Sequence, residues 1–233
     1  MKSFENILAF DTALGGMSVG VVTREAKVTR RIETAREQAA LLVPLIRETL
    51  EEANLSFADL DLIVSSTGPG SFTGLRIGLS TARSLALALD KPARGVSTLA
   101  VVARQTQTRD KRAVLLETKR RDFYVQVFDE KARPLGKPQA LEGEALLSSL
   151  QENGPCHLAG DALARFTREA GAEWVRAHAC GQSPMVLLDP LVMARMGKEA
   201  AALPPEPLEP LYLRGADVSR PKVPPRTLEG SFK

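Results

Sequence analysis

An acidic residue and a hydroxyl residue stand together at the end of an apolar segment near the N-terminus. Asp11 and Thr12 follow the run Ile7–Phe10, and Gly15 and Gly16 then allow a tight turn into the next apolar segment. A carboxylate in this place can hold a hydrated Mg²⁺ ion, while the Thr12 hydroxyl and backbone N–H groups can face a phosphate. The same residues can also satisfy the backbone of an ordinary hairpin, and spacing alone favours that interpretation.

A glycine-rich segment, 68–76, follows another apolar run and precedes a helical pattern. It reads Gly-Pro-Gly-Ser-Phe-Thr-Gly-Leu-Arg, which would place backbone N–H groups at a helix N-terminus, where anions bind. A dinucleotide fingerprint needs glycine where Thr73 stands, and a Walker loop needs lysine where Leu75 stands. The segment therefore matches neither of these two phosphate-binding motifs.

The helix expected after this loop carries a stripe of small residues. Gly74, Gly78, Ala82 and Ala86 recur every four residues, which brings them onto one face and lets another backbone approach closely. Apolar residues surround most of the rest of this helix. A helix that is apolar on nearly all sides is buried on more than one side. One of those sides is expected to meet either a neighbouring element of the same chain or another subunit.

The segment 16–20 matches the Gly-x-Ser-x-Gly pattern of a hydrolase nucleophile elbow. That motif needs a helix after the serine, whereas Ser18 leads into a strand-like segment, 19–23. The only two histidines are His157 and His178, and no histidine pair stands at metal-ligand spacing on a helix. The sequence therefore argues against serine hydrolysis and against a metal site.

The composition is that of an ordinary soluble globular protein. The 233 residues are 44% hydrophobic and 25% charged, and two His and two Cys exclude a His-rich or Cys-rich metal centre and a disulfide scaffold. The longest uncharged stretch, 62–75, is shorter than the roughly 20 apolar residues of a membrane span, and no secretory signal precedes Asp11. We therefore expect a cytoplasmic protein with no membrane association and with Cys156 and Cys180 reduced.

Basic residues concentrate in two places. Residues 214–233 hold five basic and two acidic residues, which accounts for the whole net charge of +3, and prolines are dense from 204 to 225. This end is expected to be an extended arm that either binds nucleic acid or an acidic protein, or is simply solvated. A second cluster, between residues 109 and 121, could contact a phosphate backbone, although such clusters are usually a solvated face.

Apolar periodicity predicts an α/β order of elements in the first half of the chain. The expected elements are strands at 6–11, 18–23 and 27–33, a helix at 37–53, a strand at 61–67, a helix at 75–89, a strand at 93–97 and a helix at 98–107. The order is thus β-β-β-α-β-α-β-α.

The pattern restarts 106 residues later. Leu8–Thr12 falls on Val114–Thr118, and Val19 and Val21 fall on Val125 and Val127. A period of this length indicates two copies of one domain rather than a solenoid. We therefore predict a first domain at 1–108, a shorter copy at 109–213 that ends in a helix-like stretch at 185–202 broken at Pro190, and a tail at 214–233.

Three segments together closely resemble the TsaB family, also called YeaZ. They are Ile7–Thr12, Ser65–Gly78 and Gly95–Leu99, and Leu211–Arg214 is similar to the C-terminal signature of that family. The resemblance covers nearly the whole chain and is most specific between residues 60 and 100. It implies an α/β fold of duplicated ribonuclease-H-like domains, of the actin, Hsp70 and sugar-kinase superfamily, with the second copy truncated.

The resemblance also implies a function. Members of this family are non-catalytic subunits of the bacterial machinery that makes threonylcarbamoyladenosine on tRNA, beside the anticodon of ANN-decoding tRNAs. The implied partners are the paralogous catalytic subunit TsaD, the ATPase TsaE and the tRNA, with a homodimer when the chain is alone. No intrinsic cofactor is implied, and ATP or ADP is expected only at a partner interface.

The resemblance further assigns roles to residues. The family dimerises through helices that correspond here to 37–53 and 75–89. Asp11 and Thr12 are expected to face a nucleotide because of their own chemistry and position, as described above. No catalytic residue is expected, and the first of these helices lacks the histidine pair of the metal-binding catalytic relative. The expected interface residues are Leu42, Leu45, Ile46, Gly74, Gly78, Ala82 and Ala86.

Two other functions stay open at this point. An ATP-dependent small-molecule kinase of the same superfamily would use Asp11 and Thr12 at the phosphates, but the shorter second copy argues against it because that superfamily recognises adenosine with the second lobe. A protease acting on TsaD is an idea associated with the family. It is weakened because no base stands beside a serine or cysteine in the sequence.

Overall fold

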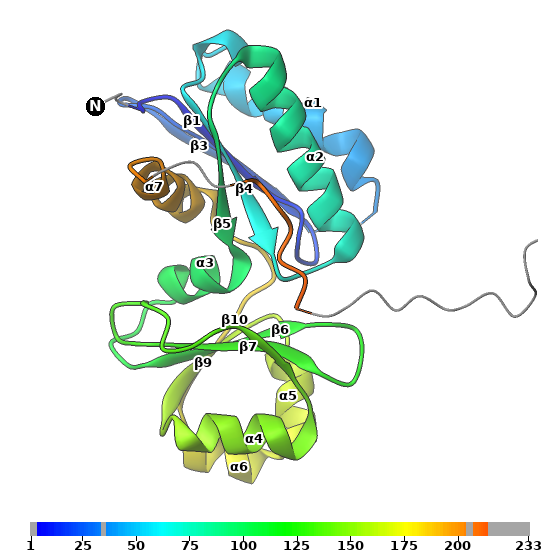
Figure 1. Ribbon diagram of the computed structural model, residues 1–233, viewed down its shortest axis with the longest axis vertical. Coiled ribbons are helices and arrows are strands. Elements are labelled where there is room, and N and C mark those ends of the chain that lie inside the picture. The colour runs from blue at the N-terminus through cyan, green and yellow to red at the C-terminus, as the bar shows by residue number, and fades with distance from the viewer. Residues whose placement is uncertain (1–3, 34–35, 204–206, 214–233) are drawn as a thin grey trace, which may run out of the picture.

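The computed structural model describes residues 4–33, 36–203 and 207–213 of the protein. It has two α/β lobes, each built on a five-stranded mixed sheet (Figure 1). The predicted arm at 214–233 lies outside the described residues. Among the helices that the structure describes, none combines the length and the apolar character needed to cross a bilayer.

The first sheet is formed by the N-terminal strands. Its spatial order is β3 (Lys27–Ile32), β2 (Met17–Val22), β1 (Ile7–Asp11), β4 (Leu62–Gly68) and β5 (Ala93–Ser97). The first three strands are antiparallel, and β4 and β5 run parallel to β1. One face is covered by α1 (Gln38–Glu52) and α2 (Phe72–Leu89), which places both predicted interaction helices in the outer layer of this lobe (Figure 1).

The second sheet repeats this arrangement. Its order is β8 (Gln139–Leu141), β7 (Phe123–Phe128), β6 (Arg112–Glu117), β9 (Cys156–Gly160) and β10 (Ala179–Pro184), with the same pattern of antiparallel and parallel pairs. Its outer helices are α4 (Gly143–Glu152), α5 (Leu163–Ala170) and α6 (Ala172–His178). The predicted duplication is confirmed. The second copy is the smaller one, because α4 and α5 have 10 and 8 residues against 15 and 18 in α1 and α2.

The predicted offset of 106 residues between the two copies is correct for β2 and β7. It is wrong by one residue for β1 and β6. Val21 pairs with Leu8, whereas Val127 pairs with Ala113 and not with Val114. Leu8 packs under the outer helices, while Val114 faces the other lobe. A shift of one residue moves a side chain to the opposite face of a sheet. Because β1 and β6 are buried on both faces, their apolar runs carry no alternation that could have fixed the register.

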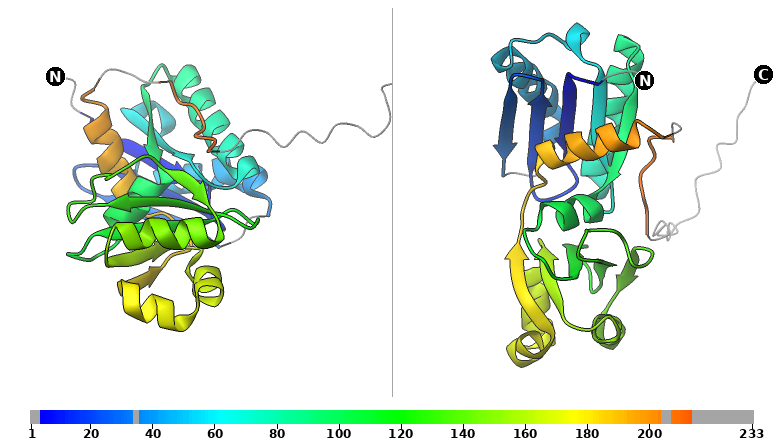
Figure 2. Two further views of the ribbon diagram at one scale, coloured as in Figure 1. Left: turned by 60° about the horizontal axis from the view of Figure 1, so that its bottom comes forward. Right: turned by 90° about the vertical axis from the view of Figure 1, so that its left-hand side faces the viewer.

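The last helix returns to the first lobe. Helix α7 (Pro190–Ala200) begins at its proline and not at 185 as predicted, because the Asp189 side chain caps it by accepting a 2.9 Å bond from the Leu191 N–H. It packs on β1, β2 and β4, opposite α1 and α2, as the right-hand view of Figure 2 shows. In space, residues 190–200 therefore belong to the first lobe, whereas the sequence analysis assigned them to the second domain, 109–213.

A single apolar core joins the two lobes. Helix α3 (Thr98–Gln105) lies between the sheets and contributes the fully buried Val101 and Val102. The same cluster contains Val64 from the first sheet, Leu116 from the second, and Met193 from α7. The lobes are therefore packed against each other through α3 over a shared core.

The segment 207–213 runs without helix or strand along the first lobe, as its prolines predicted. The Leu211 N–H donates a 2.7 Å bond to the Thr67 carbonyl, and the Arg83 guanidinium donates to the Leu208 carbonyl. The Tyr212 ring lies 5.6 Å from the ring of Phe72 at the start of α2. This segment therefore ties the C-terminal part of the described chain to α2 and β4.

Candidate functional site

Asp11 ends β1 with its carboxyl group fully buried. Its Oδ1 accepts a 2.9 Å bond from the Ala13 N–H and a bond from the Ser66 hydroxyl, while Oδ2 has no hydrogen-bond partner among the described residues. Burial raises the pKa of Asp11, against the lowering effect of the bond from Ser66. In this arrangement the Asp11 carboxyl group points into the protein.

Thr12 is also turned inward, and it joins the two candidate phosphate segments. Its Oγ1 donates a 2.7 Å bond to the Gly74 carbonyl, and the Ser71 N–H donates a 2.7 Å bond to the Ala13 carbonyl. A Cβ added at Gly74 would lie 1.8 Å from the Thr12 carbonyl oxygen, and one at Gly70 would lie 2.5 Å from the Ala13 carbonyl oxygen. Gly70 and Gly74 therefore let α2 begin in direct contact with Thr12 and Ala13, which follow β1. The two segments that the sequence offered as phosphate-binding candidates thus contact each other.

A second acidic residue faces this region from the second lobe. Asp161 follows β9, and its Oδ1 accepts a 2.8 Å bond from the Glu117 N–H at the end of β6. Burial raises the pKa of Asp161 to about 6, and the negative charges of Glu117 and Asp11 add to the effect. Groups of three or more metal-ligating side chains with suitable placement are absent from the residues that the structure describes.

The seven residues expected at a partner interface lie inside the first lobe. Leu42, Ile46 and Ala82 are fully buried in the core beneath the outer helices, and Gly78 lies against Thr12. The remaining three are Leu45 and Gly74, which are buried, and Ala86, which is partly buried. The stripe of small residues thus lets α2 pack closely against its own sheet. The sequence had left this alternative open. Six of the seven residues are buried, and Ala86 is partly exposed.

Other side chains of the same two helices face outward. We call the exposed residues of α1 and α2 the outer helix face. Its apolar members include Val43 and Leu87, which are 46% and 86% exposed, and Phe72 is 54% exposed at the start of α2. The small residues of this face are Ala39, Ala40, Ser80, Ser84 and Ala88. Its other members are charged or polar, namely Arg47, Glu48, Glu51, Glu52, Thr73, Arg76 and Arg83.

The structure also places a base beside a serine, which the sequence did not reveal. His157 Nε2 lies 2.8 Å from the Ser183 Oγ across the paired strands β9 and β10. Burial lowers the pKa of His157. No hydrogen bond orients the His157 Nδ1 among the described residues, and Gly181 packs against that edge of the ring. The pair therefore lacks the third group that orients the base in a catalytic triad.

Ser18 of the Gly-x-Ser-x-Gly pattern lies buried within β2, as its strand context predicted.

Comparisons with known proteins agree with this fold. A profile of the family described as TsaD, tRNA N6-adenosine threonylcarbamoyltransferase, matches residues 30–172. The Escherichia coli (strain K12) protein named tRNA threonylcarbamoyladenosine biosynthesis protein TsaB is 38% identical over 98 residues, 42% of each chain. A protein of the same name from Buchnera aphidicola (Schizaphis graminum) is 34% identical over 110 residues, 47% of this chain and 52% of that one. The chain spans about half the length of the curated relatives it matches.

Two solved structures from Pseudomonas aeruginosa share the architecture. One, described as an uncharacterized protein with similarity to peptidase YEAZ, superposes with a TM-score of 0.76 at 23% identity, and the other, described as YeaZ, with 0.73 at 22%. Each match covers 90% of this chain and 100% of the other. Because the TsaD-type profile matches more than half of the chain and relatives at 34% and 38% identity are named TsaB, the chain belongs to the TsaB (YeaZ) family.

Proposed function

We propose that this chain is a non-catalytic subunit of the assembly that makes threonylcarbamoyladenosine on ANN-decoding tRNAs. In this role it binds a catalytic TsaD-type subunit, and the ATPase TsaE and the tRNA join the same assembly. The family supports the pathway, since its relatives are named for threonylcarbamoyladenosine biosynthesis. The role as a partner subunit rests on the outer helix face and on the burial of Asp11 and Thr12, both described above.

The outer helix face is the observation that carries this proposal. Leu87 is 86% exposed on α2, and Val43 is 46% exposed on the neighbouring α1. Burying a side chain of this size stabilises a complex by about 1.5–3 kcal/mol relative to leaving it in water. The same face carries the small residues Ala39, Ala40, Ser80, Ser84 and Ala88, and small side chains let another helix approach closely. The same face would join two copies of the chain when the catalytic partner is absent.

The enclosed site supports a role without chemistry. Thr12 and the glycine-rich segment 68–74 are bonded to each other, and the bonded Oδ1 of Asp11 is held inside. A kinase would need these groups to reach the phosphates of a nucleotide. In a partner subunit they instead stabilise the junction of β1 and α2, which supports the outer helices.

Depletion of the chain in its source organism tests the function. Mass spectrometry of tRNA nucleosides should show loss of threonylcarbamoyladenosine, and the wild-type chain supplied in trans should restore it. An unchanged nucleoside profile after depletion would reject the proposal.

A further inference from the structure

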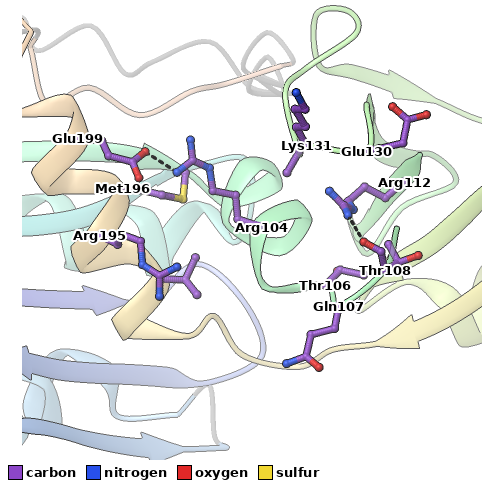
Figure 3. A pocket seen from close by; sticks show the side chains of 12 residues that line it. Arg104, Thr106, Gln107, Thr108, Arg112, Glu130, Lys131, Arg195, Met196 and Glu199 are labelled. Atoms are coloured by element: carbon purple, nitrogen blue, oxygen red, sulfur yellow. Dashed lines mark hydrogen bonds and ion pairs between the residues drawn. The ribbon is translucent and has the colours of Figure 1, made fainter. Parts of the chain in front are cut away.

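A cavity of about 560 Å³ opens between the lobes on the side of α7, away from the outer helix face. Figure 3 shows Arg195 and Glu199 of α7 on one side of it, Arg112 and Lys131 on the other, and Arg104 of α3 between them. These residues come from both lobes and are far apart in the sequence. For this reason no sequence motif predicted this cavity.

The lining carries more positive than negative charge. Arg104 and Glu199 form an ion pair with each other. Arg195 and Lys131 are exposed, and neither has a carboxylate within ion-pair distance among the described residues. Glu130 is the remaining acidic residue of the lining. An excess of cationic groups that face a shared cavity attracts an anionic ligand.

Arg112 contributes a buried charge to the same lining. The sequence placed it in a cluster typical of a solvated face, but the structure leaves it only 4% exposed. Its guanidinium donates to the Thr108 carbonyl at 2.7 Å and to the Asp129 carbonyl at 3.3 Å, and its Nε has no partner among the described residues. A buried cation held by carbonyl groups without a carboxylate is costly, and a nearby anion lowers that cost.

The cavity continues along α7. A second cavity, of about 380 Å³, shares Arg195 with the first and is also lined by Lys27 of β3 and Lys198 of α7. Its other charged residues, Arg24 and Glu5, are paired with each other. Arg195 thus stands between two cavities that both hold unpaired cations. We call the two together the α7 groove.

The chemistry of the α7 groove favours phosphates over bases. Neither cavity has an aromatic residue in its lining, so the groove offers no platform on which a base could stack. Gln107 adds a side-chain amide donor beside the cations, whereas the Thr106 hydroxyl donates to the Val102 carbonyl and the Thr108 hydroxyl to the Asp110 carboxylate. Cations and neutral donors along an open groove are the groups that contact a nucleic-acid backbone.

We propose that the α7 groove binds the phosphate backbone of the tRNA substrate. This inference rests on the proposed function, which supplies the RNA. It places a tRNA contact on the folded body of the chain, on the side of the first sheet opposite the outer helix face. The chain could then hold a protein partner and the RNA on different faces.

The test compares two double variants of the full-length chain, so that residues 214–233 are the same in both. Arg195→Ala with Lys198→Ala removes two cations of the α7 groove, and Arg168→Ala with Arg176→Ala removes two exposed cations of the second lobe as a matched control. Binding of an ANN-decoding tRNA transcript is measured by fluorescence anisotropy at several salt concentrations, for the isolated chain and for its complex with the TsaD-type subunit. Thermal melting checks that both variants fold.

The expected result is weaker binding for the groove variant, with the slope of log affinity against log salt smaller by about one for each lost contact. The control should keep the wild-type slope. A wild-type slope in the groove variant would overturn the inference. So would loss of co-purification with the TsaD-type subunit, which would make the groove a protein-binding surface. Failure of the proposed function is read separately, as an unchanged level of threonylcarbamoyladenosine after the chain is depleted.

Discussion

Gly78 of α2 lies directly against Thr12 at the end of β1, so that a Cβ added at Gly78 would lie 2.7 Å from the Thr12 Oγ1 and 3.3 Å from the Ser65 Oγ. The same Thr12 Oγ1 donates to the Gly74 carbonyl one turn earlier in the helix. Helix α2 is therefore held on its sheet by a contact that only glycine permits. The outer helix face is positioned from beneath by this contact.

Replacing Gly78 should destabilise the chain. Gly78→Ala inserts a methyl group into a closed contact with buried polar atoms, and overpacking of this kind costs about 1–3 kcal/mol. Gly136→Ala is the matched control, because nothing lies within 4 Å of a Cβ added there. Urea denaturation should give a lower free energy of unfolding for Gly78→Ala and a change within about 0.5 kcal/mol for the control. Equal values for the two variants would show that α2 can move away from Thr12 at no cost.

Much of the fold followed from local patterns. Every strand of the first sheet and the two long helices over it were predictable, because apolar runs broken by turn residues determine such elements locally. The register of the first hairpin of the second lobe was not predictable, since Val114 and Leu115 are both fully buried and either could face the outer helices. The lobe on which α7 packs was not predictable either, because its apolar stripe fits either lobe.

The candidate site was predictable only in part. The sequence indicated that a small-residue stripe lets a backbone approach, and Gly74 and Gly78 do lie against a backbone or side chain of the same chain. Which neighbour they meet depends on tertiary packing, which spacing does not encode. The α7 groove combines Arg112, Lys131 and Arg195 from separate elements, so only the folded chain brings them together.

Asp161 should make the stability of the chain depend on pH. Its pKa is about 6 in the folded state against an ordinary value of 3.8, so the folded chain binds more protons than the unfolded chain between these values. Stability therefore falls as pH rises from about 4 to about 6, by up to about 3 kcal/mol.

Asp161→Asn tests this dependence, since its amide oxygen can still accept from the Glu117 N–H. The free energy of unfolding, measured in urea between pH 4 and 8, should fall more steeply with pH in the wild type than in the variant. The difference between the two curves is the relevant quantity, because burial also raises the pKa of Asp11 and contributes in the same direction in both chains. Parallel curves would mean that Asp161 titrates at its ordinary pKa.

Met193 should matter for the first lobe although it lies late in the sequence. Its side chain is fully buried in the core that α7 shares with the first sheet, so Met193→Ala should cost about 2–5 kcal/mol. Met196→Ala, one turn further along the same helix and only partly buried, is the control and should cost less. Amide hydrogen exchange should also become faster in β1 for Met193→Ala. Exchange that quickens only in the second lobe would contradict the packing described for α7.

Leu87 should be needed for binding the catalytic partner but not for folding. It is 86% exposed on the outer helix face, so Leu87→Asp places a charge there without disturbing the core beneath it. Burying an unpaired carboxylate in an interface is strongly unfavourable, and the variant should lose co-purification with the TsaD-type subunit while its melting temperature stays near the wild-type value. Leu135→Asp is the matched control, because Leu135 is 54% exposed on the second lobe. It should bind as the wild type does. If Leu87→Asp still co-purifies with unchanged affinity, the partner binds another surface, and the homodimer expected at the same face should then also survive the substitution in sedimentation experiments.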